Sequence, residues 1–198
     1  TAQGRAFAPG MRLLLDARAS LRTINLTTEV EPEALIASGP VDYSISGNGS
    51  LAGTMWLDKM GEGKLTLSGT HSYTGVTDVW EGTLVITDTL KASAIKVRRH
   101  ASLEIAGSAG AGISTEYNAR VYPGMKGNAG ILKVTGNLLF AEGARLVVDL
   151  SQSAGGNNDK IVVDGMLTMA NAAVIEVQLT GLKLDTGTYV LASMSGFT

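Results

Sequence analysis

The fold is decided by three short runs that follow one another along the chain: Gly63-Lys64-Leu65-Thr66-Leu67-Ser68-Gly69, Tyr73-Thr74-Gly75-Val76-Thr77-Asp78-Val79 and Gly82-Thr83-Leu84-Val85-Ile86. Apolar and polar residues alternate within the runs, and glycines separate them. Alternation with a period of two is typical of strands and excludes a helix. No Asn-Gly or Asp-Gly pair joins two runs, so hairpins are not indicated. The stretch predicts a coil that bends at glycines and stacks each turn on the last.

Side-chain parity along these runs assigns the residues that point inward. The predicted core positions are Leu57, Leu65, Leu67, Thr77, Val79, Leu84 and Ile86. The corners between the short strands need residues that tolerate sharp bends, which is a property of glycine. The predicted turn glycines are Gly63, Gly69, Gly75 and Gly82.

The same stretch resembles the autotransporter-associated β-strand repeat, which occurs in passenger domains of secreted and surface-displayed bacterial proteins. The pattern of that repeat is Gly-x-Leu-x-Leu-x-Gly, then Tyr-Thr-Gly, Thr-x-Val and Gly-Thr-Leu. The matching residues are Gly63, Leu65, Leu67, Gly69, Tyr73, Thr74, Gly75, Thr77, Val79, Gly82, Thr83 and Leu84. The chain departs from the pattern at His71, where asparagine is commoner, at Val76, where glycine is, and at Trp80-Glu81. The resemblance implies a pertactin-like, adhesin-type passenger β-helix.

The second half of the chain resembles the membrane-proximal end of such passengers. The shared features are Pro123-Gly124, a Gly-x-Leu-x-Val-x-Gly pattern near residues 130–136, Asp159-Lys160-Ile161 and Gly187-Thr188-Tyr189. We therefore expect one β-helix domain over residues 1–198, with repeat-containing coils at 51–120 and C-terminal passenger-like coils at 121–198. Because no cap is evident near either end, the domain is expected to be part of a longer secreted chain.

The composition agrees with a narrow, aliphatic solenoid. The 198 residues are 44% hydrophobic but only 5% aromatic, which suits an interior filled by stacked Leu, Val, Ile and Ala. The net charge is −2 and the basic residues are dispersed, so the sequence does not indicate a basic surface that would bind nucleic acid. There is no cysteine for a disulfide or thiolate metal site, and no apolar run long enough to span a membrane. No cofactor is expected.

These patterns predict an all-β chain folded as a right-handed parallel β-helix with one strand per side in each coil. A β-sandwich is the alternative, because candidate strands recur every eight to fifteen residues. Buried runs such as Ile161-Val162-Val163 favour the β-helix. Two departures from strand structure are expected: a two-turn helix at Pro32–Gly39, and a loop over the small residues Ala106–Ser114.

Two tryptophans are the candidate ligand-binding residues. Trp56 and Trp80 each adjoin an inward position, so both should point outward, and their separation is about one coil. Exposed indoles on a polar sheet can stack on sugar rings or dock another surface. The competing interpretation is that a loop or a neighbouring domain covers both rings.

Other polar clusters carry less specific signals. Lys96, Arg98, Arg99 and His100 form a basic group, with a solvated face as the main interpretation and an acidic glycan as the alternative. Residues 155–161 superficially resemble a calcium-binding glycine-aspartate repeat, but one copy cannot complete the ligands of the ion, which favours a turn. His71 and His100 lack the spacing of a transition-metal site. Asp149, Asp159 and Asp164 are expected to be scattered at strand ends.

No catalytic residues are predicted, and the chain is expected not to be an enzyme. The resemblance implies a structural or display segment of a bacterial cell-surface or secreted protein, with adhesion to a host or cell-surface glycan or protein. The expected location is extracellular, at the bacterial outer-membrane surface, with flanking domains of the same chain as further partners. The alternative is a non-catalytic glycan-binding spacer of a secreted carbohydrate-active enzyme or protease; a β-helical polysaccharide lyase is the third hypothesis.

Overall fold

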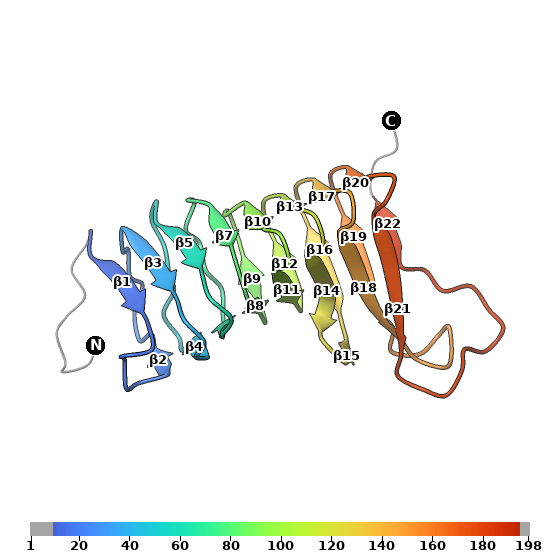
Figure 1. Ribbon diagram of the computed structural model, residues 1–198, viewed down its shortest axis with the longest axis horizontal. Helices are drawn as coiled ribbons and strands as arrows, with labels where there is room; N and C mark the ends of the chain where they lie inside the picture. Colours follow the sequence, from blue (N-terminus) through green and yellow to red (C-terminus); the bar gives the residue numbers. More distant parts are fainter. Residues whose placement is uncertain (1–9, 195–198) are drawn as a thin grey trace.

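The computed structural model describes residues 10–194. Short strands follow one another along a single long axis and form an elongated solenoid (Figure 1). Residues 1–9 and 195–198 of the predicted domain lie outside the described residues. Within residues 10–194 there is no helix, so the segment contains no helix that could cross a membrane.

The first sheet forms one long side of the solenoid and consists of eight parallel strands. Their order in the sheet is β1 (Arg12–Leu15), β3 (Ala34–Ala37), β5 (Trp56–Lys59), β7 (Thr77–Val79), β10 (Ile95–Val97), β13 (Ile113–Thr115), β17 (Leu138–Phe140) and β20 (Leu167–Met169). Strands that are neighbours in this sheet are never consecutive in the sequence. Each coil therefore contributes one strand to this side before the chain moves to the next side.

The second sheet repeats this arrangement on the neighbouring side. Its order is β2 (Thr23–Asn25), β4 (Tyr43–Ser46), β6 (Lys64–Leu67), β8 (Thr83–Ile86), β11 (Ser102–Ile105), β14 (Arg120–Met125), β18 (Arg145–Leu150) and β21 (Val174–Leu179). The short strand β15 (Asn128–Ala129) pairs with β14 in the one antiparallel contact among the described residues.

The third side is a continuous sheet only from residue 89 onward. It comprises β9 (Thr89–Leu90), β12 (Gly107–Ala109), β16 (Ile131–Val134), β19 (Lys160–Val163) and β22 (Ala192–Met194). In the first half, isolated parallel bridges between Val30 and Leu51 and between His71 and Leu90 hold this side. The prediction of a parallel β-helix is confirmed, and the sandwich alternative is wrong.

Inward side chains stack in columns that run the length of the solenoid. In the first sheet, Leu35, Leu57 and Thr77 are in register on consecutive coils. In the second sheet, a separate column is formed by Leu65, Leu84 and Leu103. The aliphatic side chains of these columns form one continuous core cluster. Stacking like residues in register buries apolar area without requiring large aromatic side chains.

Two sequence-based expectations about secondary structure are wrong. Residues 34–37 form strand β3, paired in parallel with β1 and β5, instead of a helix at Pro32–Gly39. Strand β12 and the start of β13 fall within the loop expected at Ala106–Ser114. Both segments lie between neighbouring coils and form hydrogen bonds with their backbone N–H and C=O groups. This strand pairing outweighs the local preference of the sequence for a helix or a loop.

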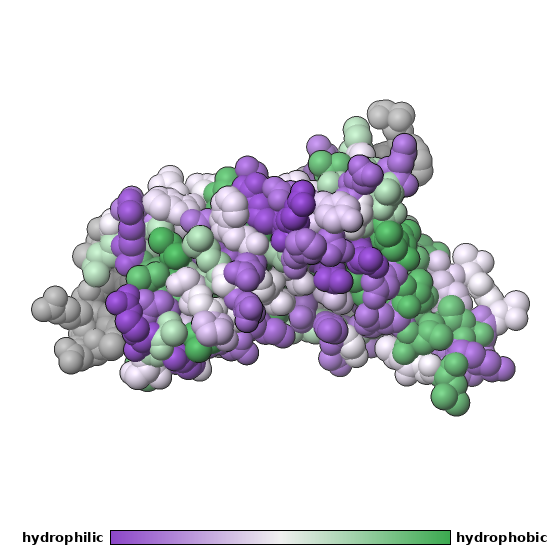
Figure 2. Space-filling model, viewed as in Figure 1, coloured by the Kyte–Doolittle hydropathy of each residue, from purple (hydrophilic) through white to green (hydrophobic). Residues whose placement is uncertain are grey.

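Apolar surface is concentrated at one end of the described solenoid. Ile175, Val177 and Leu179 of β21 continue the inward columns of β18, yet they are exposed because β21 is the last strand of its sheet. Figure 2 shows apolar residues gathered over β21 and the following segment, whereas polar residues dominate the middle of the same face.

Candidate functional site: the outer face of the first sheet

The two tryptophans lie on the outer face of the first sheet, on neighbouring strands. Trp56 begins β5, and Trp80 directly follows the end of β7. The register pairs Leu57 with Thr77 and Lys59 with Val79, so the two indoles lie near opposite ends of the strand pair. They therefore share a face and adjacent coils but do not form one continuous aromatic platform.

Each indole is in contact with an arginine from another coil. The guanidinium of Arg12 lies 5.4 Å from the centroid of Trp56, which is half-buried, and Arg12 also forms an ion pair with Glu33 at 2.6 Å. The guanidinium of Arg98 lies 4.5 Å from the centroid of Trp80, which stays 46% exposed. An arginine over the ring face gives a cation–π contact and occupies the surface on which a sugar ring would stack.

Arg98 is the centre of a polar ladder across four coils. Its guanidinium contacts Asp78 Oδ1 at 2.7 Å and Glu116 Oε1 at 2.9 Å, and the Trp80 Nε1–H donates to Asp58 Oδ1 at 3.1 Å. The hydrogen bond from Arg98 lowers the pKa of the Glu116 carboxyl, and the same bond raises the pKa of Arg98. Planar charged groups stacked in register in this way hold neighbouring coils together.

The ladder continues through the turns that follow the first sheet. Arg99 lies 5.5 Å from the Tyr117 ring, and Asn118 and His100 are joined through a 2.8 Å side-chain hydrogen bond. His100 and Asn118 take φ values of +65° and +58°, in the left-handed conformation that the third residue of each turn requires. The predicted basic group is thus divided: Arg98 and Arg99 contact neighbouring coils, while Lys96 is exposed.

The four predicted turn glycines lie where a coil approaches the preceding one or bends sharply. A Cβ on Gly63 would be 2.2 Å from Val41 O, and one on Gly75 would be 2.1 Å from Met55 O. Gly69 and Gly82 have φ values of +93° and +69°.

The predicted core residues are all fully buried: Leu57, Leu65, Leu67, Thr77, Val79, Leu84 and Ile86.

This segment, from β5 to β8, also matches a known sequence family. Residues 57–86 match the family described as Passenger-associated-transport-repeat. Over residues 57–86 the chain is thus similar to a passenger-associated-transport-repeat. Among curated proteins and among solved structures, no significant match to the chain is found. The repeat and the stacked parallel sheets together fit an autotransporter passenger-like β-helix.

The passenger-associated-transport-repeat also contributes polar groups to the interior. Tyr73, fully buried, shares a 2.7 Å hydrogen bond with Thr77, which in turn is 2.8 Å from Ser93 Oγ. Ser93 donates to Gly75 O at 2.6 Å, which completes a chain of hydroxyl groups across two coils. Every hydroxyl in this chain has a partner, so the polar core residue Thr77 is accommodated.

Lys59 is an inward lysine at a corner of the repeat. Its Nζ donates to Gly61 O at 2.6 Å and Glu81 O at 3.0 Å, so the ammonium caps carbonyl groups of two successive turns. Burial lowers the pKa of Lys59 to about 8. Sequence parity identifies this position as inward, but it does not indicate that the carbonyl groups of the turns would surround the charge.

His71, where the repeat usually has asparagine, is also buried. Its Nδ1 accepts a hydrogen bond from the Leu51 N–H at 3.1 Å, so the neutral ring carries its proton on Nε2. Nε2 is the single buried side-chain nitrogen or oxygen without a hydrogen-bond partner among the described residues. Burial lowers the pKa of His71, because the imidazolium would be poorly solvated there.

Asp149 and Asp159, expected to be scattered, come together on the second half of the solenoid. Asp159 Oδ2 accepts from Asp149 N at 2.7 Å, and its Oδ1 accepts from Gly130 N at 2.6 Å. Asp149 Oδ2 accepts from Gly127 N at 2.8 Å. The two buried carboxyl groups thus hold the β14–β15 hairpin against the second sheet. Burial, with the nearby Asp149, raises the pKa of Asp159 to about 6.

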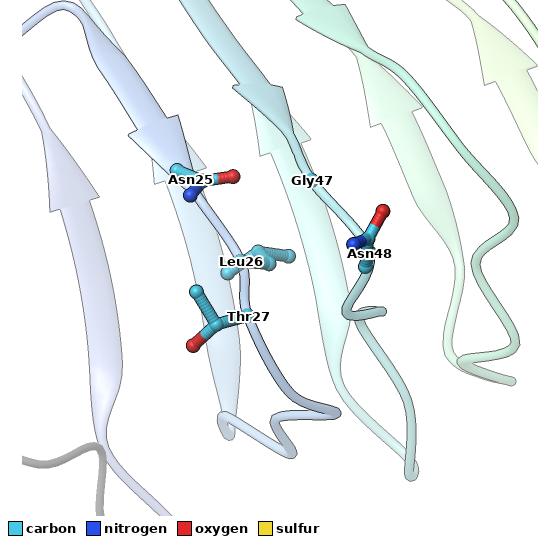
Figure 3. A pocket seen from close by; sticks show the side chains of 5 residues that line it. All are labelled: Asn25, Leu26, Thr27, Gly47 and Asn48. Atoms are coloured by element: carbon cyan, nitrogen blue, oxygen red, sulfur yellow. The ribbon is translucent and has the colours of Figure 1, made fainter.

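A small polar hollow lies at the corner that follows β2 and β4. Asn25, Leu26 and Thr27 line one side and Gly47 and Asn48 the other, around a volume of about 140 Å³ (Figure 3). A Cβ on Gly47 would be 2.2 Å from the backbone carbonyl oxygen of Leu26, so only glycine fits at this position. A hollow of this size is below the usual range for small-molecule sites and can hold a few waters.

The histidines and carboxylates of residues 10–194 do not form a cluster of three or more arranged to hold a metal ion. Residues 155–158 belong to a turn in which Asn158 Oδ1 accepts from Ser151 N at 2.7 Å and its Nδ2 donates to backbone carbonyls of the same loop. The site that the structure presents is therefore a surface: the outer face of the first sheet and its arginine–aromatic ladder.

Proposed function

We propose that this chain is a rigid display segment of a secreted or surface-exposed bacterial protein of the autotransporter type. The observation that carries the proposal is the passenger-associated-transport-repeat over residues 57–86, whose side chains fill the core and turns of a continuous solenoid. Backbone pairing between coils and an unbroken aliphatic core give stiffness along one axis. In this proposal the segment spaces and presents neighbouring parts of its chain and has no catalytic role.

The test locates the native protein on intact cells. An antibody raised against this chain would be used on immunoblots of fractionated cells, with and without protease treatment before lysis. We expect a band in the outer-membrane or secreted fraction that external protease removes, while a cytoplasmic marker protein stays intact. A band that is protected in intact cells and digested only after lysis would contradict surface display.

Adhesion to a glycan through Trp80 is the second candidate function. Its support is the partly exposed indole beside the exposed Met60 and the carboxylate of Asp58. The contact with Arg98 opposes it, because that guanidinium covers one face of the ring. Binding of the chain to a glycan array would be compared with that of the variant Trp56→Ala/Trp80→Ala. Retained binding in the folded double variant would exclude these residues as the glycan site.

A further inference from the structure

The outer face of the first sheet contains an apolar hollow beyond the tryptophans. It is an open depression over β10, β13 and β17 with a volume of about 260 Å³. Its floor is built from small outward residues, Ala94, Gly112 and Ser114, while Lys96, Asn137 and Leu139 form the rim. Leu139 is 41% exposed, so the hollow carries an apolar wall that solvent can reach.

The close packing of two coils creates this hollow. A Cβ on Gly112 would be 2.9 Å from the carbonyl oxygen of Asn137 on the next coil, so the position favours glycine. The absence of a side chain there leaves a gap between the outward side chains of β10 and β17. The depression is thus a consequence of backbone packing and does not depend on mobile loops.

Lys96 places a positive charge at the rim of the hollow. The register places Lys96 beside Asp78, but Asp78 is engaged by Arg98 at 2.7 Å. Lys96 itself is exposed and takes part in no ion pair among residues 10–194. Asn137 Oδ1 accepts from Met166 N at 2.9 Å, which orients the amide at the opposite rim.

We propose that this hollow is a docking site for a partner polypeptide that inserts one large aliphatic side chain beside an acidic residue. The volume is below the roughly 300–1,000 Å³ of small-molecule pockets, so it suits a single side chain better than a complete ligand. The unpaired ammonium of Lys96 selects a carboxylate next to that side chain. The proposal goes beyond display, because it assigns a specific contact to one part of the surface.

The experiment uses N-acetyl-leucine as the probe, since it carries an isobutyl group beside a carboxylate. Methyl resonances of Ala94, Ile113 and Leu139 would be followed by NMR in the 198-residue chain during titration. We expect saturable shifts with a Kd on the order of millimolar, as for one buried side chain and one exposed ion pair. N-acetyl-leucinamide, which lacks the charge, should bind about two- to fivefold more weakly. N-acetyl-alanine should cause little shift.

Two variants and a control separate the two parts of the site. Ser114→Leu fills the hollow from an outward strand position and should abolish the shifts. Lys96→Gln should bind the acid and the amide equally, whereas Lys133→Gln, an exposed lysine on β16, should behave as wild type. Equal binding of acid and amide by the wild-type chain, or unchanged binding by folded Ser114→Leu, would overturn the proposal. If Ser114→Leu fails to fold, the comparison of Lys96→Gln with Lys133→Gln still decides it.

Discussion

The guanidinium of Arg98 lies 4.5 Å from the centroid of the Trp80 indole and bridges Asp78 and Glu116 on either side. One residue thus joins three consecutive coils through a cation–π contact and two charge-assisted hydrogen bonds. The contact also limits what can stack on the exposed indole of Trp80, because the guanidinium occupies one of its two faces. Arg12 makes a cation–π contact with Trp56 at the longer distance of 5.4 Å, together with one ion pair to Glu33.

We expect a measurable coupling between Arg98 and Trp80. In a double-mutant cycle with Arg98→Ala and Trp80→Ala, the coupling in the free energy of unfolding should be about 0.5–1 kcal/mol, as for a cation–π pair at a partly exposed site. Urea denaturation of the four proteins measures it. Arg99→Ala combined with Trp80→Ala is the control and should show additive effects. A coupling near zero for the first pair would mean that the contact contributes nothing.

The inward columns should respond strongly to truncation. Leu67→Ala or Leu84→Ala should lower the free energy of unfolding by about 2–5 kcal/mol, because each leaves a cavity in a fully buried stack. Thr66→Ala, at an outward position on β6, is the matched control and should cost much less. Chemical denaturation gives all three values. A loss under about 0.5 kcal/mol at Leu67 would be inconsistent with its burial.

The glycine corners should tolerate a methyl group only where space exists. Gly75→Ala places a Cβ 2.1 Å from Met55 O and should destabilise the chain by at least about 2 kcal/mol, because two coils must separate. Gly155→Ala meets no atom within 4 Å, and its effect on thermal unfolding should be close to neutral. Equal thermal unfolding midpoints for the two variants would argue against close coil packing at Gly75.

Acidification should destabilise the chain through His71. Because the pKa of His71 is lowered in the folded state, the unfolded chain binds the proton more tightly. Its contribution to stability is therefore present above the ordinary pKa of about 6.5 and is lost as the pH falls below it. Denaturation at several pH values would compare wild type with His71→Asn, whose carbonyl can still accept from the Leu51 N–H. A parallel decline in the variant would assign the effect to other groups.

Acidification should have the opposite effect on stability through Asp159, which should stabilise the folded chain as the pH falls. Its pKa is raised from an ordinary 3.8 to about 6 by burial and by Asp149. The folded chain binds the proton more tightly, so this contribution is full below pH 3.8 and is lost as the pH rises through 6. The stability difference between wild type and Asp159→Asn should therefore grow in favour of wild type from pH 7 to pH 5. Exchange of the Gly130 amide would report whether the hairpin is the part affected.

Local pattern was sufficient for the backbone of the repeat. The alternation around Leu65 and Leu67 and the glycines at 63 and 75 depend on strand parity and corner geometry, which neighbouring residues determine. The same reasoning failed at residues 34–37. There Pro32 and Gly39 resemble helix boundaries, but pairing with β1 and β5 provides backbone partners that a lone two-turn helix lacks.

The sequence by itself determined that this chain forms short parallel strands with an aliphatic interior, because that information is carried by residues one or two positions apart. Only the tertiary structure decided which surface residues meet. Arg98 bonds to Glu116, 18 residues on, whereas Met166 bonds to Asn137, 29 residues back. Since coil length varies in this way, no fixed period reveals the partners. The stacking of coils brings Arg98 over Trp80, joins Asp149 to Asp159, and leaves the hollow at Gly112.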